Sequence, residues 1–292
     1  MRPNDWHLTE DIDDFLAQAG DFLRSRPALH TMPLTVTEKL RALGPAGSGN
    51  PAPVFGWLEQ SGEVRATFYR FPGRGLSVTS LTPEQADTLA VRLVSLRHAL
   101  PSVSADHTTA TAFAEAWQRH TGATPTLRFR LHLHRLGTLT PPEPAPPGRG
   151  RLVDDRDHEH LIRWCREFAA DVGETVTIDA ASWANTRFAE KSYTFWETPD
   201  GTPVSMAGVN PMVAGQIRVD PVYTPAHLRG RGYAGAVTVE VTRAALAAGA
   251  TDVVLFSDAA NPTSNALYRR IGYVPIADWA GYDFTLTESE DS

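Results

Sequence analysis

The sequence contains almost no cysteine and no long apolar segment. Cys165 is the only cysteine among the 292 residues, which excludes an internal disulfide and favours a reducing compartment. No stretch approaches the roughly 20 apolar residues that a helix needs to cross a membrane. The N-terminal stretch is acidic and lacks the basic and then apolar order of a secretory signal. We therefore expect a cytoplasmic protein with no membrane partner.

The sequence also has no excess of positive charge. Its formal net charge is −7 and its pI is about 5.8, so the charge balance does not indicate a nucleic-acid-binding surface. Hydrophobic residues make up 42% of the chain, which is enough for packed cores. The length suits one large domain or two of ordinary size.

A proline-rich segment, TPPEPAPPGRG at 140–150, divides the chain into two similar lengths. Prolines at this density favour a stiff, extended spacer. We therefore expect an N-terminal domain at 1–139, a linker at 140–150 and a C-terminal domain at 151–292.

Both halves predict the same order of elements, which is helix, hairpin and then alternating strands and helices. In the first half we expect helices at 10–24 and 110–120 and a further helix that begins at 82. We also expect a hairpin of 54–59 with 64–71, and strands at 76–81, 102–105 and 127–136. In the second half we expect helices at 154–170 and 179–189 and a hairpin of 193–197 with 203–209. The fold class is therefore α/β (α+β), with two copies of one fold.

The stretch from 213 to 273 is the most informative part of the chain. Its pattern predicts, in order, a strand at 216–223, a glycine-rich turn at 229–234, a helix that ends at 249, a buried parallel strand at 252–256 and a helix capped by Asn261 that ends at 272.

The glycine-rich turn predicts an anion site. A strand that leads through such a turn into a helix leaves backbone N–H groups without intrahelical partners at the positive end of the helix dipole. Gly230 and Gly232 allow close backbone approach, and Arg229 and Arg231 add charge, which favours a di- or polyphosphate. The alternative is a plain turn.

Gly230-x-Gly232-x-x-Gly235 also matches the dinucleotide fingerprint of a Rossmann unit. In that fold, however, the glycines follow the strand directly and an acidic residue lies about 20 residues on. Here several residues intervene, namely Pro221, Thr224, Pro225, Ala226 and His227, and Asp258 lies too far along. The Rossmann interpretation is therefore disfavoured.

The helix after the second strand carries a row of polar side chains. Asn261, Asn265 and Tyr268 are spaced i, i+4 and i+7, so they share one helical face. Such a row is either a solvated surface or part of a binding site. Because it begins just after the strand that follows the phosphate turn, we interpret it as part of the site.

These residues resemble the GNAT (GCN-related N-acetyltransferase) superfamily. Arg229-x-x-Gly232-x-Ala234 resembles its pyrophosphate-binding pattern, and the segment 261–273 resembles its second motif, whose tyrosine lies near the coenzyme sulfur. The resemblance covers roughly residues 151–284. One departure is that the connection Thr224–Leu228 is a residue longer than is common.

The resemblance implies two GNAT-like domains, each a mixed, mostly antiparallel sheet flanked by helices, with a parallel strand pair at the cofactor site. It implies binding of acetyl-coenzyme A and transfer of the acetyl group to a primary amine of a small molecule or peptide. The implied cofactor-binding residues are Val222, Tyr223, Thr224, Arg229, Gly230, Arg231, Gly232, Tyr233, Ala234, Asn261, Asn265 and Tyr268. Tyr268 is the implied catalytic residue, and its phenol would interact with the leaving thiolate.

Several points stay open at this stage. The general base could be Glu190, Glu197, Asp220, His227 or water. The donor could be a larger acyl or aminoacyl group, or the protein could be a coenzyme-binding module without turnover. The acceptor and the oligomeric state are not encoded in any recognisable pattern.

The first half has no glycine turn. Its counterpart, Leu81–Gln85, places Glu84 where a phosphate would lie, and a carboxylate satisfies a helix start and repels an anion. We therefore expect a degenerate copy.

Two histidine pairs could suggest a metal site. His132 and His134 share one strand face but have no third ligand nearby, and His158 and His160 lie in a polar helix entry. We expect no metal.

Overall fold

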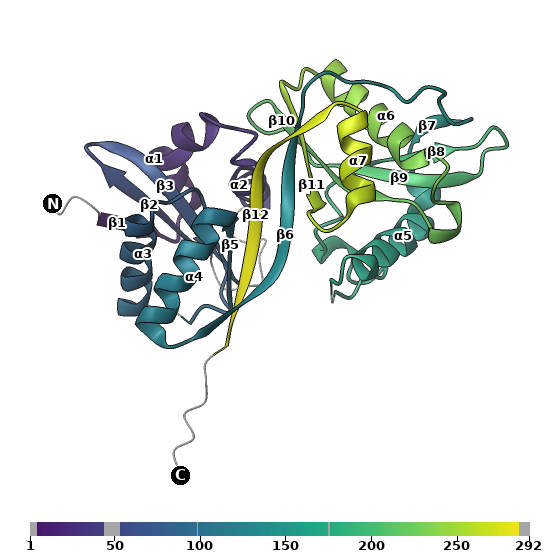
Figure 1. The fold of residues 1–292 in the computed structure, drawn as a ribbon. Coiled ribbons are helices and arrows are strands. Elements are labelled where there is room, and N and C mark those ends of the chain that lie inside the picture. The colour runs from purple at the N-terminus through teal and green to yellow at the C-terminus, as the bar shows by residue number, and fades with distance from the viewer. Residues whose placement is uncertain (1–4, 44–52, 98, 175, 286–292) are drawn as a thin grey trace, which may run out of the picture. The chain divides into compact units, whose positions relative to one another are not determined.

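The computed structural model describes residues 5–43, 53–97, 99–174 and 176–285 (Figure 1). The chain forms two compact units. Unit 1 comprises Met1–Leu133, Asp258–Ala260 and Ile276–Ser292, and unit 2 comprises His134–Ser257 and Asn261–Pro275. This division differs from the boundaries expected at 139/140 and 150/151, because the proline-rich segment lies within unit 2 and the C-terminal residues belong to unit 1.

Unit 1 is a mixed sheet with helices. Its elements are β1 Asp5–Thr9, α1 Ile12–Arg24, α2 Thr31–Leu43, β2 Val54–Gln60, β3 Glu63–Arg70, β4 Leu76–Val78, α3 Pro83–Ser95, β5 Ser102–Asp106, α4 His107–Thr121, and parts of β6 Thr124–Leu136 and β12 Tyr273–Thr285. The strand order is β1-β2-β3-β4-β5-β12-β6. Strands β4 and β5 are parallel, and the pairs β1/β2, β2/β3, β3/β4 and β5/β12 are antiparallel.

Helices cover both faces of this sheet. Phe15 of α1 stacks on Phe55 of β2 with ring centroids 4.9 Å apart. Leu58 and Phe68 join a core formed with buried residues of α3 and α4. The β2–β3 hairpin turns at Ser61 and Gly62, as predicted, and both have positive φ.

Unit 2 has the same plan. Its elements are β7 Arg149–Leu152, α5 His158–Asp171, β8 Ser192–Glu197, β9 Pro203–Val209, β10 Gln216–Tyr223, α6 Tyr233–Ala247, β11 Asp252–Asp258 and α7 Pro262–Arg270, with the remaining parts of β6 and β12 and the short 3-10 helices Asp155–Asp157, Trp183–Asn185 and Ala226–Leu228. The strand order is β6-β11-β10-β9-β8-β7. Strands β10 and β11 are parallel, and β7/β8, β8/β9 and β9/β10 are antiparallel. The predicted fold class is therefore confirmed.

Helices α5 and α6 cover opposite faces of the unit 2 sheet (Figure 1). Successive side chains of β8 point alternately to these two faces of the sheet. Phe195 packs with Trp164 of α5, while Trp196 belongs to the core beneath α6. This arrangement places the turn between β10 and α6 at the edge of a well-packed core.

Some sequence predictions of secondary structure are wrong. The predicted helix at 179–189 is absent, and these described residues form turns with a 3-10 helix at Trp183–Asn185. The reason is local, because the Ser182 N–H donates to the Asp179 carboxylate at 2.8 Å and the Asp179 N–H donates to the Ser182 hydroxyl at 3.0 Å. Such side-chain bonds offer the backbone an alternative to a helix.

Four strands and helices were not predicted, namely β1, α2, β12 and β7. The last of these begins at Arg149, inside the expected linker, so the end of the proline-rich segment pairs as an edge strand with β8. None of the helices in the part of the chain that the structure describes is long and apolar enough to span a bilayer.

Candidate active site

Strands β10 and β11 separate at the centre of unit 2. Their parallel pairing joins Gln216–Val219 to Asp252–Leu255. The pairing of β10 with β9 then shifts register between Val219 and Val222, which marks a bulge at Asp220. Beyond it, no pairing with β11 is present among the described residues, so the edge of β10 at Val222 and Tyr223 has no partner strand on that side.

The turn after β10 has the conformation that the sequence predicts. Gly230 and Gly232 have φ values of +77° and +83°, in the left-handed region that favours glycine. Gly232 is the N-cap of α6, and no side chain caps this helix start. The first-turn N–H groups, from Tyr233 and Ala234 onward, therefore have no side-chain cap and lie at the positive end of a 15-residue helix.

The two arginines of the turn form hydrogen bonds that stabilise it. Arg229 Nε donates to the Thr224 carbonyl oxygen at 2.9 Å, and its guanidinium also pairs with Asp171 of α5. Arg231 donates to the His227 carbonyl oxygen at 3.4 Å. Arg229 is thus partly neutralised by Asp171, and its main structural effect is to hold the turn closed.

Helix α7 presents its polar row from a fixed position. Asn261 caps the helix by accepting the Ser264 N–H at 3.0 Å, so one oxygen of the predicted row is used by the helix itself. Asn265 and Tyr268 are buried, with 7% and 8% of their surface exposed. Asn261 is exposed, whereas Asn265 and Tyr268 are part of the protein interior, so the row as a whole is not a solvated surface.

The electrostatics of Tyr268 suit a hydrogen-bond donor. Burial raises the pKa of its phenol well above the ordinary value, and the negative charge of Asp220 raises it further. The phenol is therefore protonated throughout the neutral range. Its ring contacts those of His134 and Tyr273, with centroids 6.1 Å and 6.3 Å away.

Asp220 does not have the properties of a general base. Burial alone would raise the pKa of its carboxyl, but the charges of Lys191, Arg187 and Arg218 outweigh this and hold the pKa well below the usual range. Lys191 pairs with the carboxylate and also donates to the Asp220 carbonyl oxygen at 2.9 Å. Arg187 links Asp220 to Glu174. The cluster fixes the bulge of β10.

The other candidate bases lie in different surroundings. Glu197 accepts from Arg151 at 2.6 Å, and Arg151 also forms two hydrogen bonds with Asp157, so the carboxylate is held in a salt bridge. Glu190 directly precedes Lys191, and His227 lies in the 3-10 helix before the glycine turn. Glu197 is therefore not available as a free carboxylate, and no residue is assigned as the general base.

Two groups of residues near the site were not predicted from the sequence. One is the ion cluster of Lys191, Arg187 and Glu174 around Asp220, of which only Arg187 lies in the segment 179–189 that was wrongly predicted as a helix. The other is the contact of His134 with Ser257 at 2.8 Å. The signal for the first was Asp220-Pro221 inside the predicted strand, which indicates a bulge.

The histidines of the two pairs have different partners. His132 Nδ1 lies 2.7 Å from Asp278, whereas His134 contacts Ser257. His160 packs edge-on against Trp164. In the described ranges, no group of three or more potential ligand residues could hold a metal ion.

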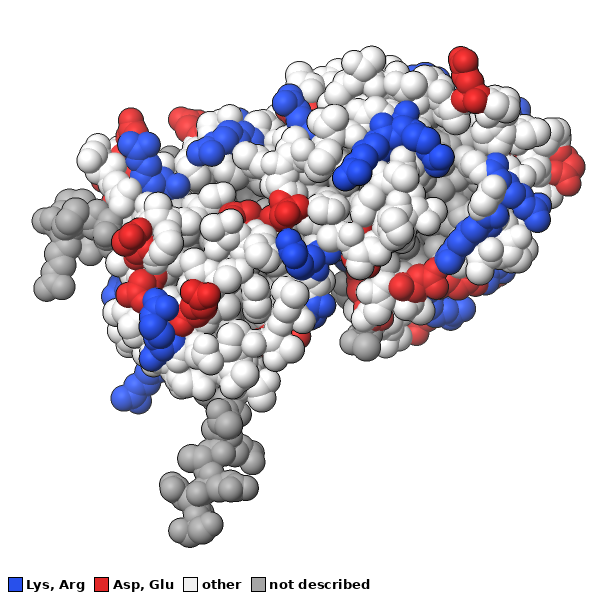
Figure 2. Space-filling view, in the orientation of Figure 1, with Lys and Arg blue, Asp and Glu red and all other residues white. Residues whose placement is uncertain are grey.

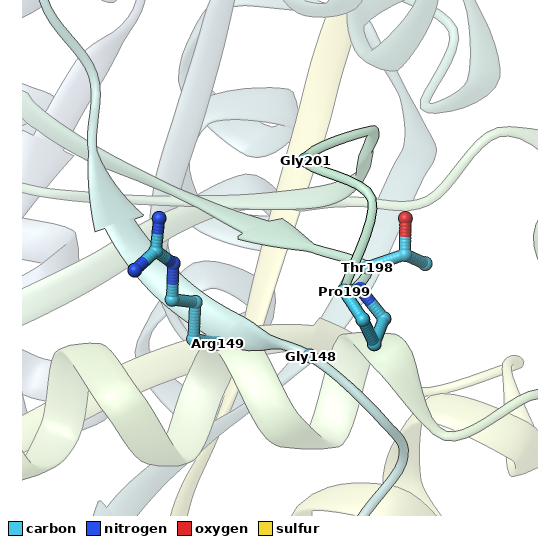
Figure 3. A pocket seen from close by; sticks show the side chains of 5 residues that line it. All are labelled: Gly148, Arg149, Thr198, Pro199 and Gly201. Atoms are coloured by element: carbon cyan, nitrogen blue, oxygen red, sulfur yellow. The ribbon is translucent and has the colours of Figure 1, made fainter.

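A hollow of about 360 Å³ lies at another place in unit 2 (Figure 3). It is formed at the start of β7 and at the β8–β9 turn, and its lining residues are Gly148, Arg149, Thr198, Pro199 and Gly201. None of the predicted site residues lines it, so we do not include it in the candidate site.

The surface carries mixed charge. On the face that Figure 2 shows, Lys and Arg side chains alternate with Asp and Glu side chains in both units. This agrees with the net charge of the sequence.

Unit 1 differs from unit 2 at the corresponding helix start. Thr82 and Gln85 form a capping box at the start of α3, in which each accepts the other's backbone N–H, at 3.2 Å and 3.0 Å. The Leu81 N–H donates to Thr109 Oγ1 at 2.8 Å. The start of α3 is thus satisfied internally, by a capping pair as well as by the acidic Glu84 expected from the sequence.

The region of the candidate site is similar to a known protein family. Residues 213–280 match a family model described as FR47-like protein. A search among curated proteins found no match.

Solved structures share the fold. A GCN5-related N-acetyltransferase from Sphaerobacter thermophilus is 19% identical, with a TM-score of 0.60 over 97% of this chain and 95% of that chain. One from Kribbella flavida is also 19% identical, with a TM-score of 0.51 over 77% of this chain and 89% of that chain. A tandem GNAT protein from the clavulanic acid biosynthesis pathway is 13% identical, with a TM-score of 0.55 over 95% of this chain and 98% of that chain.

The fold is therefore a mixed sheet whose parallel strand pair, β10 and β11, separates after Val219. The chain has the fold of the GNAT superfamily, and the resemblance predicted from the sequence is confirmed.

Proposed function

We propose that the protein is an acetyl-coenzyme A-dependent N-acetyltransferase whose site lies in unit 2. The observation that carries this proposal is the combination of three features around one strand pair. These are the separation of β10 from β11 after Val219, the uncapped start of α6 at Gly232, and the buried phenol of Tyr268 on α7. The GNAT fold of the solved relatives supports the same reaction class.

In this proposal the turn binds the cofactor's phosphates. The N–H groups after Gly232 would bind the pyrophosphate, with Arg229 and Arg231 adding positive charge. The backbone of Val222–Thr224 would lie along the arm that carries the thioester and would donate N–H groups to its carbonyl oxygen. Asn261 and Asn265 would flank the thioester end.

The chemical step is transfer of an acyl group between sulfur and nitrogen. The nitrogen of a neutral amine attacks the thioester carbon, the carbon–sulfur bond breaks, and the amine proton leaves to solvent or to a base. Tyr268 would donate a hydrogen bond to the departing sulfur. Because the phenol's pKa lies above that of a thiol, about 8.5, a hydrogen bond rather than full proton transfer is expected.

The acceptor is proposed to be a primary amine of a small molecule or peptide. Two alternatives use the same site, namely a donor with a larger acyl or aminoacyl group, and a coenzyme-binding module without turnover. The buried, protonated Tyr268 favours the enzyme over the module, because simple binding does not need a donor at the sulfur.

Calorimetry with coenzyme A and acetyl-coenzyme A, followed by a thiol assay with a panel of amines, tests the proposal. We expect binding of both ligands and release of free coenzyme A with at least one class of amine. Binding without release for any amine would support the module, and absence of binding would overturn the proposal.

A further inference from the structure

Three buried polar side chains from three different elements form a chain of hydrogen bonds behind α7. They are His134 of β6, Ser257 of β11 and Asn265 of α7, with 0%, 6% and 7% of their surface exposed. His134 Nε2 lies 2.8 Å from Ser257 Oγ, and Ser257 Oγ donates to Asn265 Oδ1 at 2.6 Å. This chain ends on a residue of the predicted cofactor site.

The direction of the hydrogen bonds follows from the serine. A hydroxyl has one proton, and Ser257 gives it to Asn265. The imidazole of His134 must then be the donor to Ser257, which requires the tautomer with a proton on Nε2. As a result, the Asn265 carbonyl oxygen faces Ser257 and its NH₂ group faces away from Ser257.

The same strand holds α7 at other points. The ring of His134 lies 6.1 Å from that of Tyr268, at an interplanar angle of 55°. Past the end of β6, the Gly137 N–H donates to the Gly272 carbonyl oxygen at 2.9 Å. The Thr140 N–H donates to the Ile271 carbonyl oxygen at 3.0 Å. The strand and the residues that follow it therefore hold the C-terminal end of α7 as well as the amide of Asn265.

Core stability alone does not explain the polar chain. Apolar side chains of similar shape would fill this volume at little or no cost, whereas a buried polar group that loses its partner costs free energy. What the polar chain adds is a defined orientation for one amide, next to the one phenol that the reaction would use. His134 also precedes the proline-rich segment, so the residues 151–292 expected to form the acetyltransferase domain do not include it.

We propose that His134 and Ser257 are positioning residues that orient Asn265 and Tyr268 toward the thioester end of the cofactor. This inference rests on the proposed function, since it assigns a role within the same site. His134 and Ser257 act only through Asn265 and Tyr268, and neither is assigned contact with the reacting atoms.

Four variants test the inference. Ser257→Ala removes the central link and Ser257→Thr keeps the hydroxyl. His134→Phe keeps a ring beside Tyr268 and removes the N–H donor. His132→Phe is the matched control, because this neighbouring histidine contacts Asp278 instead.

For Ser257→Ala and His134→Phe we expect kcat to fall by about 10-fold, as for a slightly misplaced reacting group. We expect coenzyme A affinity and the folded fraction to be nearly unchanged. Ser257→Thr and His132→Phe should retain wild-type kcat. In an Asn265→Ala background, Ser257→Ala should lower kcat no further, because its effect passes through Asn265.

A second measurement does not depend on activity. Nitrogen NMR of the imidazoles should show His134 protonated on Nε2 in the wild type, and this signal should shift in Ser257→Ala. Wild-type kcat in folded Ser257→Ala and His134→Phe, or a His134 ring protonated on Nδ1 alone, would overturn the inference while leaving the proposed function in place. A wild-type protein that does not bind coenzyme A would overturn the proposed function, and the inference with it.

Discussion

Tyr268 is the residue on which the proposed chemistry depends most. Its phenol is buried, and burial together with the charge of Asp220 raises its pKa. A phenol in this state donates a hydrogen bond at every pH at which an amine could be acetylated. It is therefore suited to stabilising a developing thiolate.

Tyr268→Phe should lower kcat by roughly 10²-fold, within the range for acid–base groups, with little change in coenzyme affinity. The ring stays and only the hydroxyl is lost. Steady-state kinetics at equal folded concentration measure the effect.

Tyr273→Phe is the matched control. Tyr273 is also buried, but its hydroxyl is 2.6 Å from Thr242 Oγ1 on α6. Its loss should lower stability by about 1 kcal/mol and leave kcat unchanged. Equal turnover in the wild type and in Tyr268→Phe would remove Tyr268 from the mechanism.

Asp220 is the second residue whose surroundings lead to a prediction. Its carboxylate compensates the charge of Lys191, whose side chain is only 2% exposed. Asp220→Asn leaves that charge buried without its partner, and we expect unit 2 to lose about 3–5 kcal/mol of stability. Urea denaturation measures this loss, and Glu240→Gln, which affects only the exposed pair with Arg243, should change little.

The loss should depend on pH in a defined direction. Because the folded-state pKa of Asp220 is lowered, its stabilisation is present above the unfolded carboxyl value of about 3.9 and disappears as pH falls through the folded-state value. The difference between wild type and Asp220→Asn should therefore be largest near neutral pH and shrink below about pH 4. A difference that grows on acidification would contradict the ion-pair account.

At the scale of elements, we propose that the glycine turn and the helix it starts bind the cofactor. Gly232→Glu would place bulk and negative charge at the start of α6, and we expect no measurable binding of acetyl-coenzyme A by calorimetry. Gly249→Glu is the matched control, because Gly249 also has a positive φ, of +92°, but lies at the other end of the same helix. Gly249→Glu carries similar backbone strain and should retain affinity.

Unchanged affinity in folded Gly232→Glu would show that the ligand binds elsewhere. Loss of affinity in both variants would indicate general damage to α6 rather than a specific anion site. Circular dichroism before the titration checks that each variant is folded.

Much of the region around the site could be predicted from the sequence. Strand β10 has the predicted bounds, and the cap at Asn261 and the positive φ at Gly272 lie where expected. These features are local, since they depend on side-chain alternation and on capping and turn residues.

The features that could not be predicted depend on distant residues. Arg229 is paired with Asp171, and Glu197 is held by Arg151, so neither side chain is as free as its sequence position indicates. The contact of His134 with Ser257 joins residues more than 120 positions apart. No periodicity or spacing reports such pairs, because only the tertiary fold brings them together.

At the scale of the whole molecule, the two units share one fold but differ at the point where a cofactor would bind. In unit 2 the helix start after the first parallel strand is uncapped and preceded by two glycines with positive φ. In unit 1 the start of α3 is closed by the Thr82–Gln85 capping box. We therefore propose that unit 1 is a degenerate copy without a cofactor site.

The units also share chain segments. Strands β6 and β12 each contribute residues to both units, so the division in space does not follow a single cut in the sequence. His134 is one consequence, because it precedes the proline-rich segment yet belongs to unit 2. A fragment that starts after this segment would lack that part of the site.

A calorimetric titration of the intact chain with acetyl-coenzyme A tests the central claim most directly. The account predicts saturation at one equivalent per chain for the wild type and no heat of binding for Gly232→Glu. Two equivalents would show that unit 1 also binds the cofactor, and one equivalent that persists in Gly232→Glu would place the site outside the glycine turn of unit 2. Either of these results would contradict the account.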